Sequence, residues 1–146
     1  LSASTTDGST LPALKETALG VISGTFWGPD FNNPASKKFV ADFEKKYSRI
    51  PSQYAAQAYD SALLIDSALK KTGGKAADKA ALTNALRTAD FKSVRGNFRF
   101  NKNGFPIQDM HVFEVAKDSA DRVSLKTVST PLKNLSDPYV TDCPLK

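Results

Sequence analysis

The stretch ALGVISGTFWGPD, residues 18–30, decides how the rest of the chain is interpreted. Its first part, Ala18–Thr25, is short, apolar and bounded by glycine, which predicts a buried β-strand. Its second part, Phe26–Asp30, contains Gly and Pro and must leave regular structure. Before it, Thr10-Leu11-Pro12 is typical of a capped helical turn. We therefore expect a turn, a buried strand and then a break in the chain.

Three helices are predicted after this break. The first begins at Asn33-Pro34, where a capping residue precedes a proline, and it ends before Pro51. The second covers about Gln53–Thr72 and is apolar around most of its circumference, so we expect it to be largely buried. The third spans roughly residues 78–90 and has one apolar face.

The remaining residues predict a β-meander. Three segments alternate between apolar and polar residues with a period of two: 97–100, 110–115 and 122–128. Asn101–Gly104 ends in Asn-Gly, which is a strong signal for a hairpin turn.

One buried aromatic face of the hairpin would contain Phe98, Phe100 and Phe113. The end of the chain, from Pro131, is expected to be irregular. The fold class is therefore α/β, with too few strands for a free-standing doubly wound sheet, so the chain is interpreted as a piece of something larger.

The charge pattern indicates a solvated surface. The 146 residues include 20 Lys and Arg and 15 Asp and Glu, for a net charge of +5. The lysines are scattered and lie mostly beside acidic residues in the predicted helices. No apolar run approaches the roughly 20 residues that a membrane helix needs. Residues 1–10 also lack the basic start and apolar middle of a signal peptide.

The sequence predicts no enzyme, no cofactor and no metal site. His111 is its single histidine and Cys143 its single cysteine, so a Ser–His, Cys–His or thiolate-zinc arrangement cannot be assembled. No nucleophile elbow, phosphate loop or dinucleotide fingerprint is present. We expect His111 to be a half-exposed strand residue.

A nucleic-acid-binding module is the alternative function. Arg95–Phe100 mixes basic and aromatic side chains, as the base-stacking strand of an RNA-recognition domain does. That signature requires an aromatic residue directly after the glycine, and Asn97 stands there instead. Aromatic side chains at breaks in the chain favour a different reading. Trp27 and Tyr54 each combine a large ring with a polar tip, which suits a half-solvated small-molecule pocket.

Five collinear segments together resemble the solute-binding proteins of branched-chain amino acid type ABC transporters. These segments are 18–25, 30–35, 39–43, 54–62 and 96–104. Members of that family are periplasmic, have two α/β lobes joined by crossovers and clamp a solute between the lobes. They deliver the solute to a membrane permease and are not enzymes.

The resemblance implies that this chain is the C-terminal portion of a two-lobe fold. Residues 1–28 would end one lobe and enter a crossover. Residues 29–94 would form the helical part of the other lobe, and residues 95–146 the β-hairpin, return strand and tail. The missing N-terminal part of the protein would complete the fold. The chain would be a proteolytic or recombinant fragment, or a piece completed by another chain.

The resemblance also implies where a ligand would bind. Tyr54 matches the family's aromatic residue at the start of the helix that closes the cleft. Amino-acid binders hold the ligand's amine with a glutamate, but the matching position here is Ala3, so the candidates nearby are Thr5, Thr6 and Asp7. Trp27, after the strand, is a further candidate.

The absent glutamate favours an aromatic or other carboxylic acid as the ligand, and a branched-chain amino acid comes next. A buried carboxylate prefers hydroxyl, backbone N–H or arginine donors, whereas an ammonium needs a carboxylate. In an oxidising periplasm Cys143 would pair with a cysteine outside this chain, with a free thiol as the alternative.

Overall fold

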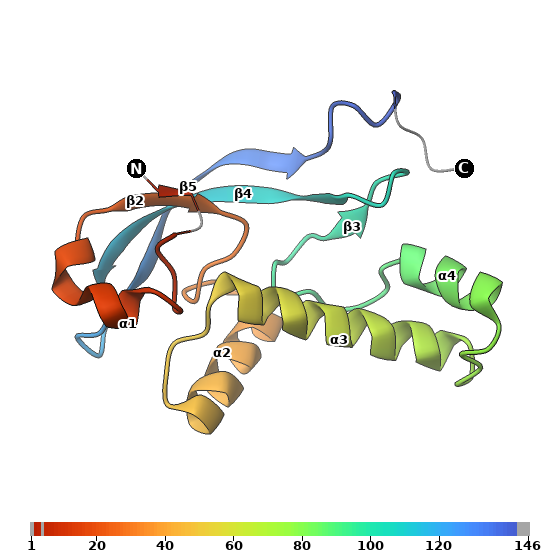
Figure 1. The fold of residues 1–146 in the computed structure, drawn as a ribbon, viewed down its shortest axis with the longest axis horizontal. Coiled ribbons are helices and arrows are strands. Elements are labelled where there is room, and N and C mark those ends of the chain that lie inside the picture. The colour runs from red at the N-terminus through yellow and green to blue at the C-terminus, as the bar shows by residue number, and fades with distance from the viewer. Residues whose placement is uncertain (1, 4, 143–146) are drawn as a thin grey trace.

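The computed structural model describes residues 2–3 and 5–142. Its helices are α1 (Leu11–Leu14), a 3₁₀ turn (Lys15–Ala18), α2 (Pro34–Tyr47), α3 (Gln53–Lys71) and α4 (Lys79–Arg87). Its strands are β1 (Ser2–Ala3), β2 (Ile22–Thr25), β3 (Arg99–Phe100), β4 (Pro106–Lys117) and β5 (Val123–Leu135). The helices lie on one side of the strands, and α3 is the longest of them (Figure 1).

The long strand β4 organises the sheet. The described strands follow the order β1-β2-β4-β3, and β5 also pairs with β4. β1 runs parallel to β2, while β2, β3 and β5 are each antiparallel to β4. β3 pairs with the first residues of β4, Pro106 and Ile107, whereas β2 pairs with His111 to Glu114. β4 therefore connects two parts of the structure. The helical part contains α2, α3, α4 and β3, and the sheet part contains β1, β2, β5 and α1.

Each part has its own apolar core. Beneath the sheet, Phe113 and Val115 of β4 pack with a cluster that includes Leu11, Ala18 and Leu125. Among the helices, the buried cluster consists of Trp27, Phe39, Ala56 and Val94. Phe31 is partly buried against both clusters, so the break after β2 joins the two cores.

Local capping chemistry explains the helix starts. The side chain of Asn33 accepts a hydrogen bond from Ser36 N at 2.8 Å, and Pro34 opens α2. Ser52 caps α3 by accepting from Ala55 N, and Asp78 caps α4 by accepting from Ala81 N. These contacts confirm the predicted starts, because a cap needs only residues that are close in sequence.

The predicted buried strand at 18–25 is shorter in the structure. Residues 15–18 form the 3₁₀ turn, and β2 begins only at Ile22. Gly20 has a φ of +79°, a conformation that ends one element before the next begins.

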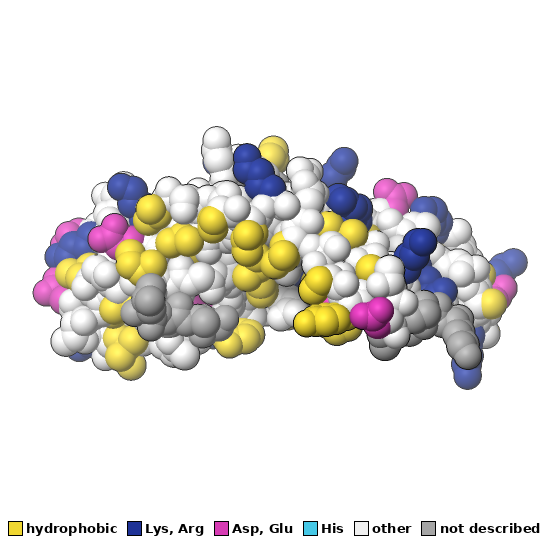
Figure 2. All heavy atoms as spheres, turned by 90° about the horizontal axis from the view of Figure 1, so that it is seen from above, with side chains coloured by type: hydrophobic (Ala, Val, Ile, Leu, Met, Phe, Trp, Pro, Cys, Tyr) yellow, Lys and Arg dark blue, Asp and Glu magenta, His cyan; other side chains and the backbone are white. Residues whose placement is uncertain are grey.

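The prediction that α3 is largely buried was wrong. Only four of its 19 residues are buried, namely Gln53, Ala56, Asp60 and Ala68. Ile65 is 52% exposed. Within residues 5–142, α3 packs against α4 and, through Ala56, against the helical core, and apart from Ala68 its other apolar side chains are partly or fully exposed there. Exposed hydrophobic side chains also spread over the face seen from above in Figure 2.

The β-meander differs from the prediction at both ends. β3 holds two residues rather than 97–100, and β5 continues through Pro131 to Leu135 instead of ending in irregular chain. Among the described residues β5 pairs only with β4, and such an edge strand tolerates proline because its outer side needs no N–H donor.

The predicted shared aromatic face is also wrong. Phe113 is fully buried and stacks with Phe31 beneath the sheet. Phe98 and Phe100 contact each other at 5.1 Å between ring centroids, and Phe98 also contacts Phe91. The rings therefore divide between the two parts of the structure.

Candidate functional site

The carboxyl ends of β1 and β2 define the candidate site. These strands are parallel, so the segments that follow them, residues 5–10 and Phe26–Asp30, leave the sheet at the same edge. In α/β sheets, ligands commonly bind outside the carboxyl ends of parallel strands. The start of α3 faces this edge (Figure 1).

Loop 5–10 is held in shape by its own hydroxyl and carboxylate groups. Thr10 Oγ1 donates to the Thr5 carbonyl at 2.8 Å and accepts from Asp7 N at 3.1 Å. Asp7 Oδ1 accepts from Ser9 N at 2.8 Å and from Ser9 Oγ at 2.5 Å. The Asp7 carbonyl accepts from Thr10 N and Leu11 N, which leads the chain into α1.

Two contacts connect this edge to the start of α3. Thr25 Oγ1 donates a hydrogen bond to Gln53 Oε1, and Gln53 is buried. Gly8 lies so close to the segment before α3 that a Cβ atom on it would be 2.5 Å from the Pro51 carbonyl oxygen and 2.6 Å from that of Ile50. Glycine is thus required for the backbone segments to approach this closely.

Unsatisfied polar atoms gather at the same edge. Within the described chain, the buried side-chain oxygens without a hydrogen-bond partner are Thr6 Oγ1, Asp7 Oδ2 and Ser23 Oγ. Two belong to loop 5–10, and Ser23 lies in β2 opposite Ser2 of β1. Buried polar groups are nearly always hydrogen-bonded, so such a concentration indicates a place where something else supplies partners.

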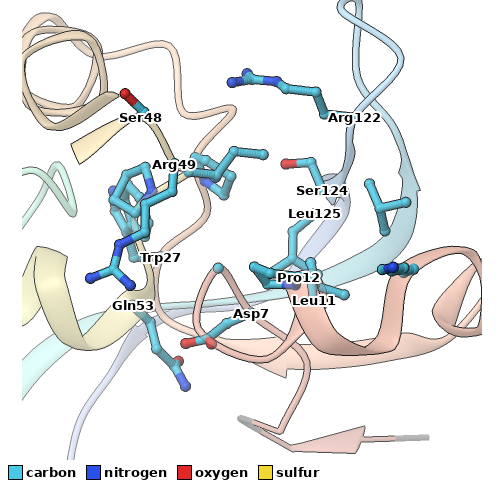
Figure 3. A pocket seen from close by; sticks show the side chains of 16 residues that line it. Asp7, Leu11, Pro12, Trp27, Ser48, Arg49, Gln53, Arg122, Ser124 and Leu125 are labelled. Atoms are coloured by element: carbon cyan, nitrogen blue, oxygen red, sulfur yellow. The ribbon is translucent and has the colours of Figure 1, made fainter. Parts of the chain in front are cut away.

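A cavity of about 360 Å³ lies between the sheet part and the segment before α3. Asp7, Leu11, Trp27, Gln53 and Leu125 are among the residues that line it. Figure 3 shows the side chains of Asp7 and Gln53 at one end of this space, with Leu11 of α1 and Leu125 of β5 on another side of it. The cavity is therefore mostly apolar and has a buried carboxylate at one end.

The structure separates the predicted site residues into two groups. Asp7 (2% exposed) and Trp27 (1% exposed) line the cavity. Trp27 is also part of the helical core, where its Nε1 donates to Ser36 Oγ at 2.9 Å. Thr5, Thr6 and Tyr54 do not line the cavity, and Tyr54 is 57% exposed at the start of α3.

Sequence reasoning missed Gly8, Gln53 and Arg49. Gln53 directly precedes Tyr54, and Arg49 lies two positions before Pro51 in the segment between α2 and α3. Their roles depend on contacts between distant segments. Gln53 accepts from Thr25 of β2, Gly8 approaches the carbonyls of Ile50 and Pro51, and Arg49 lines the cavity. For Gln53 the available signal was its position: it is a polar residue at the first position of a helix, directly after Pro51 and Ser52.

The nucleic-acid alternative loses one of its two basic residues in the structure, while the other, Arg99, is exposed. β3 contains only Arg99 and Phe100, and the side chain of Arg95 is 8% exposed and paired with Asp60. A buried, paired guanidinium cannot neutralise a phosphate. Cys143 lies outside the described residues, so its predicted pairing stays a prediction.

The stretch of residues 5–142 brings together no group of three or more His, Cys, Asp or Glu that could hold a metal ion. Its helices are each too short or too polar to cross a bilayer.

The comparison with known sequences gives a family. The sequence model of the periplasmic binding protein family matches residues 1–120. The Leu/Ile/Val-binding protein homolog 6 of Brucella abortus (strain 2308) is 32% identical over 116 residues. Those residues are 77% of this chain and 29% of the relative.

Solved structures agree with this family. The solute-binding protein of an ABC transporter from R. palustris, in complex with benzoate, has a TM-score of 0.82 and 26% identity. The match covers 91% of this chain and 35% of that one. A solute-binding protein from Rhodopseudomonas palustris BisB5, in complex with 3,4-dihydroxy benzoic acid, has a TM-score of 0.80 and 27% identity. That match covers 90% of this chain and 36% of the other.

A leucine-binding protein from Thermotoga maritima MSB8 shares the fold at a TM-score of 0.69, with 22% identity over 88% of this chain and 35% of its own. The chain therefore spans about a third of the length of the proteins it matches. From the match over residues 1–120 and the shared fold, the chain belongs to the periplasmic binding protein family and forms part of its two-lobe fold.

Proposed function

We propose that the full-length protein containing this chain is the solute-binding component of an ABC transporter. It binds a small organic solute between two lobes in the periplasm and passes it to a membrane permease, without chemical conversion. In this proposal residues 1–28 end one lobe, residues 29–94 form helices of the other, and residues 95–146 return to the first. The missing N-terminal part of the protein supplies the rest of the cleft.

The observation that carries this proposal is the set of unsatisfied oxygens at the carboxyl edge of β1 and β2. Thr6 Oγ1 is a buried hydroxyl that can donate to a ligand carboxylate, and Ser23 Oγ lies on the neighbouring strand. Hydrogen bonds that involve a carboxylate are about twice as strong as neutral ones. Tyr54 directly follows Gln53, and Thr5 lies three residues before Gly8, so both are close in sequence to these contacts. They would contribute the outer wall of the solute site.

The favoured solute class is an aromatic or other carboxylic acid. By the family resemblance, Ala3 takes the position where amino-acid binders have a carboxylate. Two structural neighbours are complexes with benzoate and 3,4-dihydroxy benzoic acid. A branched-chain amino acid is the second candidate. It is favoured by Asp7 Oδ2, which is buried, unsatisfied in the described structure and able to accept from an ammonium group.

Calorimetry on the full-length protein tests both classes. Benzoate, 3,4-dihydroxybenzoate, 4-hydroxybenzoate and leucine form the panel, and a ligand at 100 times its Kd should stabilise the protein by about 2.7 kcal/mol. Absence of heat and of any thermal shift across a broad panel of acids and amino acids would end the proposal.

Two substitutions divide the candidates. Thr6→Val keeps the shape but removes the hydroxyl, and it should weaken binding of an acid by about five- to tenfold. Thr83→Val, at an exposed position of α4, is the matched control and should leave binding unchanged. Asp7→Asn should weaken an amino acid strongly and leave an acid bound as well as before, since only the ammonium needs the charge.

A further inference from the structure

A second polar cluster is centred on Arg95, where the segment after α4 packs against Asp60 of α3. The guanidinium Nε donates to Asp60 Oδ2 at 2.9 Å, and Nη1 donates to Gln108 Oε1 at 2.8 Å. The Arg95 side chain is 8% exposed and that of Asp60 is 1% exposed. The pair is therefore a buried ion pair with defined geometry rather than a surface contact.

Aromatic rings cover the same guanidinium. Its Cζ lies 4.5 Å from the centroid of the Phe98 ring and 5.0 Å from that of Phe26. A guanidinium stacks on aromatic faces, whereas a lysine ammonium presents only a compact point charge. The rings and the two hydrogen bonds therefore select arginine at this position.

The carboxylate of Asp60 is fully used. Oδ1 accepts from Val94 N at 2.9 Å, and Oδ2 accepts from Ser93 Oγ at 2.6 Å as well as from Arg95. A buried polar network in which every member is satisfied is rigid and specifies one arrangement. The cluster thus holds residues 93–95 in a single position on α3.

The groups around Arg95 come from the segments that connect the two parts of the structure. Asp60 belongs to α3 in the helical part. Phe26 directly follows β2, where the chain leaves the sheet. Gln108 lies in β4, between the residues paired with β3 and those paired with β2. Both connections therefore contact the same guanidinium.

We propose that Arg95 is a positioning residue for lobe closure: it holds the segment after β2 and the strand β4 at one angle to α3. In doing so it sets the fraction of molecules in the closed arrangement. The effect on solute affinity rests on the proposed solute-binding function, whereas the effect on the angle does not. Gln108 and Phe26 are the contacts through which the angle is set.

The test compares Arg95→Lys and Arg95→Ala with Arg99→Ala in the full-length protein. Arg99 is an exposed arginine four residues away that donates to Asn134, so its removal controls for loss of charge and of one hydrogen bond. Spin labels at Ala13→Cys in α1 and Lys45→Cys in α2 report the distance between the two parts, with Cys143 and every other native cysteine of the full-length protein replaced by serine. Both label positions are exposed.

Arg95→Lys keeps the charge beside Asp60 but loses the fork and the ring stacking, so the label distance distribution should broaden relative to wild type. Affinity for whichever panel solute binds should fall about tenfold, equivalent to about 1.4 kcal/mol. Arg95→Ala should broaden the label distance distribution further. Arg99→Ala should change neither the distance distribution nor the affinity.

Two results would overturn the proposal. One is a lower thermal midpoint of Arg95→Lys with an unchanged label distribution, which would make the cluster a structural contact only. The other is an unchanged midpoint and an unchanged distribution. A wild-type protein that binds no solute would defeat the proposed function, while the distance measurement would still decide the role of Arg95.

Discussion

Replacement of Gly8 by alanine tests whether close approach of the two parts is needed for binding. A Cβ atom at this position would be 2.5 Å from the Pro51 carbonyl oxygen and 2.6 Å from that of Ile50. Ordinary van der Waals contact begins at 3.4 Å, so the shorter contact falls about 0.9 Å short of it. Both obstructing atoms belong to the backbone, so no side-chain rotation relieves the overlap.

The size of the effect follows from the cost of overpacking, which is typically about 1–3 kcal/mol. Gly8 lies in the loop after β1, and Ile50 and Pro51 precede α3. Under the proposed function these segments belong to different lobes, so opening the lobes would remove the overlap. The strain therefore falls on the closed arrangement. If only that arrangement holds the solute tightly, affinity should fall by about 5- to 150-fold. Loss of unfolded-state entropy offsets about 0.4–1 kcal/mol in global stability.

The assay is calorimetric titration of the full-length protein, together with its denaturant midpoint. Gly24→Ala is the matched control, because a Cβ atom there has its nearest neighbour, the His111 carbonyl oxygen, at 3.9 Å. Gly24→Ala should bind as the wild type does. Equal affinity and equal stability of Gly8→Ala and Gly24→Ala would refute the reasoning, because the overlap would then carry no energetic cost.

Three further outcomes are expected. Ser36→Ala removes the acceptor of the buried Trp27 N–H and should lower the free energy of unfolding by about 1–3 kcal/mol in urea titrations. Burial lowers the pKa of His111 below its usual 6.5, against the attraction of Asp109 and Asp30. The folded state thus binds fewer protons than the unfolded one, and stability should fall as the pH drops through about 6.5, a dependence that His111→Gln should flatten. Residues 1–146 expressed alone should unfold at low denaturant, since α3 buries only four of 19 residues; a cooperative high-temperature transition of the monomer would contradict this.

Elements coded by neighbouring residues were predictable from the sequence. The caps at Asn33 and Asp78 form as expected because donor and acceptor are three residues apart. The hairpin after β3 also forms at Asn101–Gly104, where Gly104 N donates to the Asn101 carbonyl at 2.9 Å. These interactions need no information about distant parts of the chain.

The length of β4 and β5 could not be predicted from alternation. The pairing register shifts between Gln108 and Phe113, so the period of two that marks a strand is interrupted there. The burial of α3 was also predicted wrongly, because burial depends on other segments as well as on the helix's own sequence. Its apolar circumference shows that the helix needs partners, but the segments described here provide few of them.

The candidate site was predictable only in part. Asp7 and Trp27, 20 positions apart, do line one cavity. The approach of Gly8 to Pro51 and the bond from Thr25 to Gln53 join residues from different elements, and no local pattern encodes them. Whether any of the predicted residues binds a ligand stays a prediction: Thr5, Thr6, Asp7, Trp27 and Tyr54.

The distribution of satisfied and unsatisfied groups suggests which lobe holds the solute first. The unsatisfied buried oxygens within the described residues belong to Thr6, Asp7 and Ser23, all on the sheet side. On the helical side, the Trp27 N–H and the Gln53 amide oxygen are already bonded. Under the proposed function, the lobe that contains the sheet part therefore holds the polar end of the solute first. Closure then brings the start of α3, near Tyr54, against the solute.

This order separates two substitutions by their kinetics. Thr6→Val removes a hydrogen bond that the solute would form in the open and in the closed arrangement, so it should weaken binding even in a variant that cannot close. Gly8→Ala strains only the closed arrangement, and its effect should be a faster dissociation rate with little change in association. Stopped-flow measurements on the two single variants and the double variant would show additive losses if the two steps are independent. Strong non-additivity would mean that Thr6 meets the solute only after closure, and that the sheet lobe does not bind it first.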